Sequence, residues 1–266
     1  KSDTLAFVVD LHRFSRQAFI VCSLIIINLF LLDLVVNYLA FVELKAIRRI
    51  FNIELEGSLC NWVSSIIYLS VALSLWANYA FSTRTPTQHK HKWGWLFMAF
   101  VFTYLAADDG AEIHERIGTA MNEYYEKTAW NPHFSLVRWI VDWFPSYYWQ
   151  AAFTPIFLSI GCFMIWHLYA SLETRTLLLF VGCGFLCFII AQGLDYLEGI
   201  HYSFPWIRDP LSLSKRTIRH FQKSIEECLE MIGMALLLFA FLKNLALKLG
   251  SLHIRPDSEP APPIRE

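Results

Sequence analysis

The chain has 266 residues, of which 56% are hydrophobic, 16% aromatic and only 17% charged, and its mean hydropathy is +0.41. These values are typical of a membrane protein with several spans and argue against a soluble domain. A net charge of −1 without a basic stripe argues against nucleic-acid binding. The six cysteines lie mostly inside apolar runs and form no C-x-x-C pair, so the sequence predicts neither a disulfide framework nor a structural zinc site.

Six apolar segments are separated by polar connections. We expect spans at residues 17–42, 58–81, 93–116, 149–171 and 177–201, and a sixth that opens near residue 225. The sequence therefore predicts an all-α polytopic membrane protein, folded as a bundle of six transmembrane helices. We assign residues 1–249 to this single domain. Residues 250–266 carry mixed charge and several prolines, which predicts a disordered tail.

The first segment carries a polar pair, Asp33 and Asn37. Residues four apart share one face of a helix, so these two side chains can hydrogen-bond to each other or point together at a neighbouring helix. We interpret the pair as a contact that holds helices together, with a catalytic role for Asp33 as the alternative.

Ionisable residues lie within the third and sixth segments. Only about 15 residues separate Trp93 from Asp108, whereas a helix that crosses the hydrocarbon needs roughly 20. The apolar part of the sixth segment, between Glu230 and Lys243, is also too short to cross unaided. The acids of both segments therefore enter the bilayer, where ionisable groups normally face the protein interior and mark a functional site.

Counting the crossings places these acids on one side of the bundle. The start of the second span, the ends of the third and fifth, and the start of the sixth all face the same side. We therefore expect one polar chamber near one membrane face, which also includes Glu56 and Glu226. Lys and Arg are balanced between the two sides, so the positive-inside rule does not orient the protein.

Glu198 and His201 form a Glu-x-x-His pair, whose side chains share one face of a helix. In bundles that bind two iron or manganese ions, this motif on two helices joins Glu residues from two others. A second Glu-x-x-His is absent from this sequence, so both a single ion and a pair remain open.

The other helices supply further carboxylates at helical spacing. On a third helix that continues through Arg116, Asp108, Glu112 and Glu115 form one stripe, and His114 projects to one side. The predicted metal ligands are Asp108, His114, Glu115, Glu198, His201, Glu227 and Glu230. The predicted catalytic bases are Glu112 and Asp195, because acids outside the ligand set can activate a bound water or a substrate.

An oxygen-rich ligand set with His and without Cys suits iron, manganese or zinc, and magnesium or calcium if the His residues stand aside. The physical reason to expect a cation is that crowded carboxylates repel one another unless a cation or protons compensate. Arg116, Arg219 and Lys223 are candidates for part of that compensation. The alternative is a mutually paired, partly protonated network that only specifies helix packing.

Four groups of residues in this chain match a recurrent pattern of motifs. They are Glu56 six residues before Trp62 and followed by Ser64-Ser65, Asp108-Asp109 with His114-Glu115, Asp195 after Gly-Leu, and Glu226-Glu227 with Glu230-Met231 and Gly233. On these features the chain resembles a family of multipass bacterial membrane proteins that has no assigned activity. Asp109 departs from the family pattern, which has Glu at this position. The resemblance implies a shared site and a location in the bacterial inner membrane.

Together these observations predict an integral membrane metalloprotein, acting as an enzyme on a lipid or another apolar substrate reached from the bilayer. The first alternative is an ion- or proton-coupled transporter, because intramembrane acids bind cations or relay protons in pumps. The second is a non-catalytic subunit that docks on other membrane subunits. The expected partners are membrane lipid and an apolar or lipid substrate. If the protein is a non-catalytic subunit, its partners include other membrane subunits. We expect no nucleic-acid partner.

Overall fold

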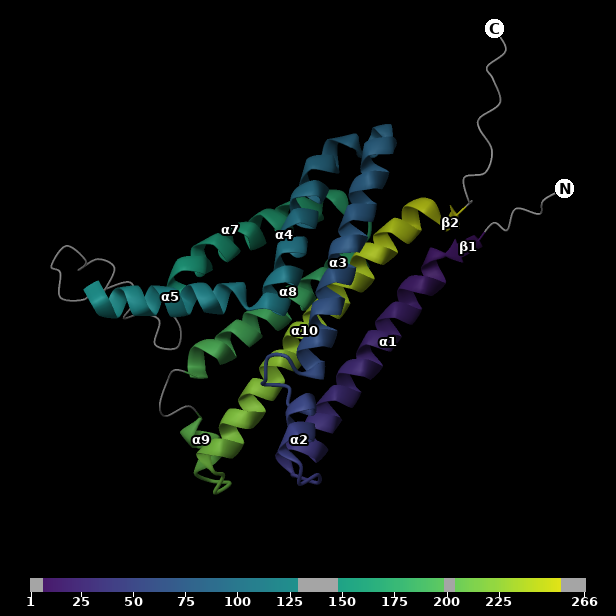
Figure 1. Cartoon of the computed structure of the whole chain (residues 1–266). Coiled ribbons are helices and arrows are strands. Elements are labelled where there is room, and N and C mark those ends of the chain that lie inside the picture. Colours follow the sequence, from purple (N-terminus) through teal and green to yellow (C-terminus); the bar gives the residue numbers. More distant parts are fainter. Residues whose placement is uncertain (1–6, 129–147, 199–203, 255–266) are drawn as a thin grey trace, which may run out of the picture.

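The computed structural model describes residues 7–128, 148–198 and 204–254, which form an all-α bundle with one short pair of strands (Figure 1). In chain order the elements are β1 (Phe7–Asp10), α1 (Leu11–Leu32), the π-helix η1 (Asp33–Tyr38), α2 (Lys45–Phe51), α3 (Leu59–Arg84), the 3-10 helix η2 (Pro86–His91), α4 (Lys92–Ala111), α5 (Ile113–Thr128), α7 (Tyr148–Ser171), α8 (Arg175–Glu198), α9 (Pro205–Arg208), α10 (Lys215–Leu249) and β2 (Ser251–Ile254).

Helix α10 is the central element, and α1, α3 and α8 pack around it. Its 35 residues make it roughly 50 Å long at about 1.5 Å per residue. The Ser214 hydroxyl caps its first turn by accepting from the backbone N–H of Thr217 at 3.1 Å. Along its middle, Met234, Leu237 and Phe241 are almost completely buried, which is why this helix forms the core of the bundle.

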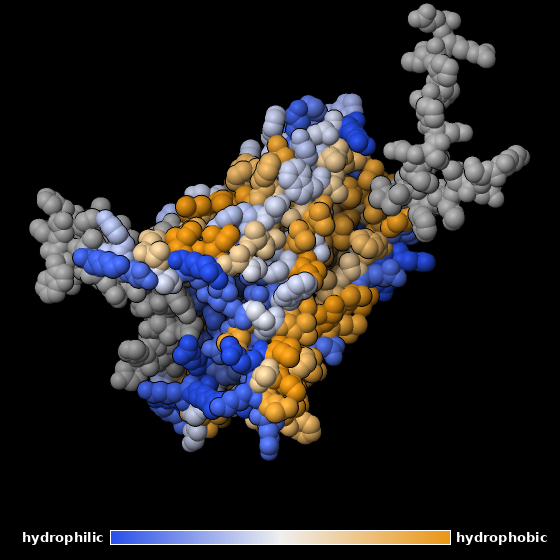
Figure 2. All heavy atoms as spheres, viewed as in Figure 1, coloured by the Kyte–Doolittle hydropathy of each residue, from blue (hydrophilic) through white to orange (hydrophobic). Residues whose placement is uncertain are grey.

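Four helices are long and apolar enough to cross a membrane. They are Leu11–Tyr38, Leu59–Arg84, Phe153–Ser171 and Arg175–Leu197. In the first and the last two, only 17–22% of the residues in the most apolar stretch are buried, so these helices present hydrophobic side chains outward. Figure 2 shows this hydrophobic surface along α1, whereas hydrophilic residues gather below α5, toward α9. Helices α4 and α10 are not among the four, and both carry charged residues within their length.

The third helix does not continue through Arg116, contrary to the sequence expectation. Helix α4 ends at Ala111, and Glu112 adopts a left-handed conformation with φ of 56° before α5 begins at Ile113. The Asp108 carboxylate accepts from the backbone N–H of His114 at 2.8 Å and so satisfies a donor in the first turn of α5. The predicted stripe of Asp108, Glu112 and Glu115 on one helix is therefore wrong, because this bend gives the three residues different directions.

The first and the last described segments, β1 and β2, lie side by side at one end of the bundle (Figure 1). Strands β1 and β2 pair antiparallel, with Asp10 opposite Ser251. Gly250 ends α10 with φ of +68°, a conformation that glycine adopts without steric cost. Residues 251–254, which the sequence assigned to a disordered tail, are thus a strand, and residues 255–266 lie outside the described residues.

Helices α8 and α10 make close backbone contact at a pair of glycines. A Cβ atom added at Gly233 would lie 2.9 Å from the Phe188 ring and 3.1 Å from the carbonyl oxygen of Gly184. Small residues at such a crossing let two helices approach closely, as they do in membrane helix pairs. The contact fixes the last turns of α8 beside the first turns of α10, where the ionisable residues of both helices lie.

Candidate functional site

Ionisable side chains from α4, α8 and α10 interact electrostatically inside the bundle. The charge of Glu230 interacts with those of Asp109, Lys223 and Asp195, and the charge of Glu227 interacts with those of Glu230, Lys223 and Glu226. We call this set the polar interior, and its members are Asp109, Asp195, Lys223, Glu226, Glu227 and Glu230. Asp195 and Glu226 are each only 4% exposed, whereas Glu227 and Glu230 are half-buried.

Helix α3 supplies the polar partners of Asp109 and Glu230. The hydroxyls of Ser64 and Ser65 donate to the Asp109 carboxylate at 3.0 and 2.6 Å, and the Tyr68 hydroxyl donates to Glu230 at 3.5 Å. Asn61 completes a stripe with these residues, because positions 61, 64, 65 and 68 share one face of a helix. That spacing is visible in the sequence and could have identified the hydroxyl partners.

Lys223 is the cation that compensates part of this charge. Its ammonium lies 2.8 Å from Glu226 and 3.6 Å from Asp195, whose other carboxylate oxygen accepts from Gln150 at 2.6 Å. Within the described ranges, Oε2 of Glu226 and Oε1 of Gln150 are buried without a hydrogen-bond partner. Asp195, predicted as a catalytic base, is therefore held by an amide and an ammonium. Gln150 has no periodic partner in the sequence that would have identified it.

Asp108 and His114 form the closest acid–imidazole pair of the site. Asp108 is only 4% exposed. Its carboxylate lies 2.7 Å from Nδ1 of His114 and also accepts a hydrogen bond from the Tyr104 hydroxyl at 3.5 Å. Burial lowers the pKa of His114, but the hydrogen bond and charge of Asp108, with the charges of Glu115 and Glu230, outweigh it and raise the pKa above its usual value. Asp108 thus fixes the orientation of the ring and favours its protonated form.

Glu112 and Glu115 lie at the rim of this site, beside Glu56. A hydrogen bond with the Glu115 side chain and burial raise the pKa of Glu56, and a hydrogen bond with Glu56 raises the pKa of Glu112. Glu112 also pairs with the exposed guanidinium of Arg116 at 3.3 Å. Glu112, predicted as a catalytic base, is therefore a rim residue at the turn between α4 and α5.

The Glu-x-x-His pair is only partly described. Glu198 is the last residue of α8, but its side chain and the whole of His201 lie outside the described residues. Among the side chains that the structure does describe, no group of three or more His, Cys, Asp or Glu is placed to hold a metal ion. The metal ligands therefore remain a prediction. The structure places Asp108 with His114 and Glu226 with Lys223.

Asp33 and Asn37 hold helices together, as the sequence indicated. The Asn37 amide donates to Asp33 at 3.0 Å, and the second carboxylate oxygen accepts from Ser224 of α10 at 3.0 Å. His220, also of α10, approaches the same oxygen at 3.1 Å. Every one of these partners is a protein group inside the bundle, so the cluster ties η1 to α10.

Comparison with known proteins gives a family for this chain. Residues 18–245 match the model of the family described as "Domain of unknown function (DUF8692)", so the match includes every helix that contributes to the polar interior. No curated protein and no solved structure matches the chain.

Proposed function

The chain belongs to this family of unknown function, and we propose that it is an integral membrane protein that crosses the bilayer six times. The proposal adds α4 and α10 as two further spans to the four candidate spans. Helices packed between other helices need little apolar outer surface, and α10 is enclosed by α1, α3 and α8. The resemblance to bacterial membrane proteins favours the bacterial inner membrane as its location.

The proposed activity is that of a metal-dependent enzyme acting on a lipid or another apolar substrate. The observation that carries it is the charge imbalance of the polar interior. Among the described residues, only hydroxyls donate to the carboxylates of Asp109 and Glu230, while Lys223 is engaged by Glu226 and Asp195. Interacting carboxylates at low dielectric need a cation or protons to compensate their charge.

Glu227 and Glu230 would hold the ion together with Glu198 and His201, which the sequence predicts as ligands. Carboxylate and imidazole ligands favour iron, manganese or zinc. Such an ion supplies Lewis acidity and an activated water at neutral pH. Asp195, which the Lys223 ammonium and the Gln150 amide hold in its ionised form, is the proposed general base.

Metal analysis of the purified protein tests this proposal. We expect stoichiometric iron, manganese or zinc in the wild type and its loss in the double variant Glu227→Gln, Glu230→Gln. This double variant should fold, because glutamine has nearly the shape of glutamate and its neutral amide removes the repulsion between the two carboxylates. Glu123→Gln, on the exposed surface of α5, is the matched control and should keep the metal. A wild type without metal after growth with each of the three ions would overturn the proposal.

A proton or cation carrier is the second candidate. It is favoured by the row of interacting titratable groups that leads inward from Glu56 and Glu115 through His114 to Glu230. Such rows relay protons in pumps. Proton flux into liposomes that disappears in Glu230→Gln, from a protein that binds no metal, would select this function over the enzyme.

A further inference from the structure

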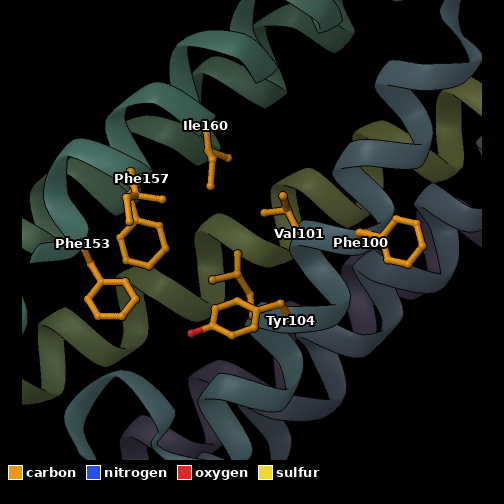
Figure 3. A pocket seen from close by; sticks show the side chains of 8 residues that line it. Phe100, Val101, Tyr104, Phe153, Phe157 and Ile160 are labelled. Atoms are coloured by element: carbon orange, nitrogen blue, oxygen red, sulfur yellow. The ribbon is translucent and has the colours of Figure 1, made fainter. Parts of the chain in front are cut away.

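An apolar pocket lies between α4 and α7. Its volume is about 370 Å³, within the range of roughly 300–1,000 Å³ that is typical of ligand pockets. The lining residues are Phe100, Val101, Tyr104, Leu105, Phe153, Ile156, Phe157 and Ile160. Figure 3 shows Phe153 and Phe157 of α7 across the pocket from Tyr104 of α4, whose hydroxyl points toward their side. The lining is almost wholly apolar, so water has no polar partners in it.

The two helices diverge from a tight contact at their other ends. The imidazole of His167 lies directly on Gly94, where an added Cβ would overlap the ring. One turn further along α4, the rings of Phe97 and Phe163 pack edge to face at 4.9 Å. Beyond them the helices separate, since the N-terminal part of α7 packs mainly on α5. The pocket therefore lies where the two helices separate.

The polar end of the pocket is part of the site already described. The Tyr104 hydroxyl donates to Asp108 at 3.5 Å, and Asp108 holds His114. Asp108 is one helical turn beyond Tyr104, so the carboxylate that holds His114 lies next to the Tyr104 side of the lining. A molecule that fills this space would have an apolar part beside α7 and a polar part beside Asp108 and His114.

We propose that this pocket binds one hydrocarbon tail of a membrane lipid, with the polar head of that lipid at Asp108 and His114. The α7 side of the pocket lies in the candidate span Phe153–Ser171, and Ile156 and Phe100 next to the opening are more than half exposed. In a bilayer these side chains face lipid chains, which have the same apolar character as the lining. The inference rests on the proposed membrane enzyme and names the place where its substrate class binds.

Photo-crosslinking tests the proposal with full-length protein in nanodiscs of phosphatidylcholine that carry a diazirine on one acyl chain. Peptide mapping should concentrate the crosslinks on residues 100–105 and 153–160, and excess unlabelled lipid should compete. Ile160→Trp fills the pocket and should lose this labelling. Leu158→Trp is the matched control on the same helix, because Leu158 is 66% exposed and does not line the pocket.

Crosslinks spread evenly over α1, α7 and α8, or unchanged by Ile160→Trp, would overturn the proposal. Thermal unfolding of both variants shows whether they fold, and a lower-volume variant, Ile160→Phe, replaces Ile160→Trp if it does not. Metal content is measured in the same nanodiscs. Labelling of the pocket in a protein without metal would overturn only the proposed metalloenzyme, and bound metal without pocket labelling would overturn only this inference.

Discussion

Gly233→Ala should weaken the contact that holds α8 on α10. The added Cβ would lie 2.9 Å from Phe188 and 3.1 Å from the backbone oxygen of Gly184, so the two helices must move apart by several tenths of an ångström. Overpacking of this kind costs about 1–3 kcal/mol, whereas Gly to Ala in a helix interior gains about 1 kcal/mol from propensity. We therefore expect a net loss of about 0–2 kcal/mol in the free energy of unfolding.

Gly182→Ala is the matched control, because a Cβ at Gly182 meets nothing within 4 Å. It should gain about 1 kcal/mol from the same change in propensity, so the two variants differ by the steric cost alone, about 1–3 kcal/mol. At about 2–4 °C per kcal/mol for a chain of this size, thermal unfolding in detergent should place Gly233→Ala about 2–12 °C below Gly182→Ala. Equal unfolding temperatures would refute the close contact of these helices.

Two further predictions concern buried polar contacts. Asn78→Val should reduce the free energy of unfolding by about 1–3 kcal/mol, since Asn78 accepts from the Asn244 amide at 2.7 Å between two almost fully buried residues. A double-mutant cycle with Asn244→Leu that shows no coupling would contradict this. Folding raises the pKa of His114 above its unfolded value of 6.5. The pair with Asp108 therefore stabilises the folded protein fully below pH 6.5, and this contribution is lost as the pH rises through the folded pKa. Unfolding temperatures should therefore fall above pH 6.5 in the wild type and fall less in Asp108→Asn; an unchanged slope would show that the pair does not titrate with folding.

The sequence by itself determined the helical segments that carry long apolar runs. The predicted spans at 58–81, 149–171 and 177–201 agree within a few residues with α3, α7 and α8. Long apolar runs are local properties, because any helix that presents them must bury them or face lipid. The hydrogen bond between Asp33 and Asn37 was predictable for a similar reason, since residues four apart meet on any helix.

Tertiary structure decided which ionisable groups of different helices meet. The left-handed turn at Glu112 is invisible in the helical spacing, because it depends on the Asp108 carboxylate capping the next helix. That turn moved Glu112 to the rim and paired Asp108 with His114. Lys223 of α10 meets Asp195 of α8 because these two helices, which are separate segments of the sequence, pack together at their glycines. The spacing of residues along the chain determines which side chains share a face of one helix. Only the packing of the helices determines which residues of other helices that face contacts.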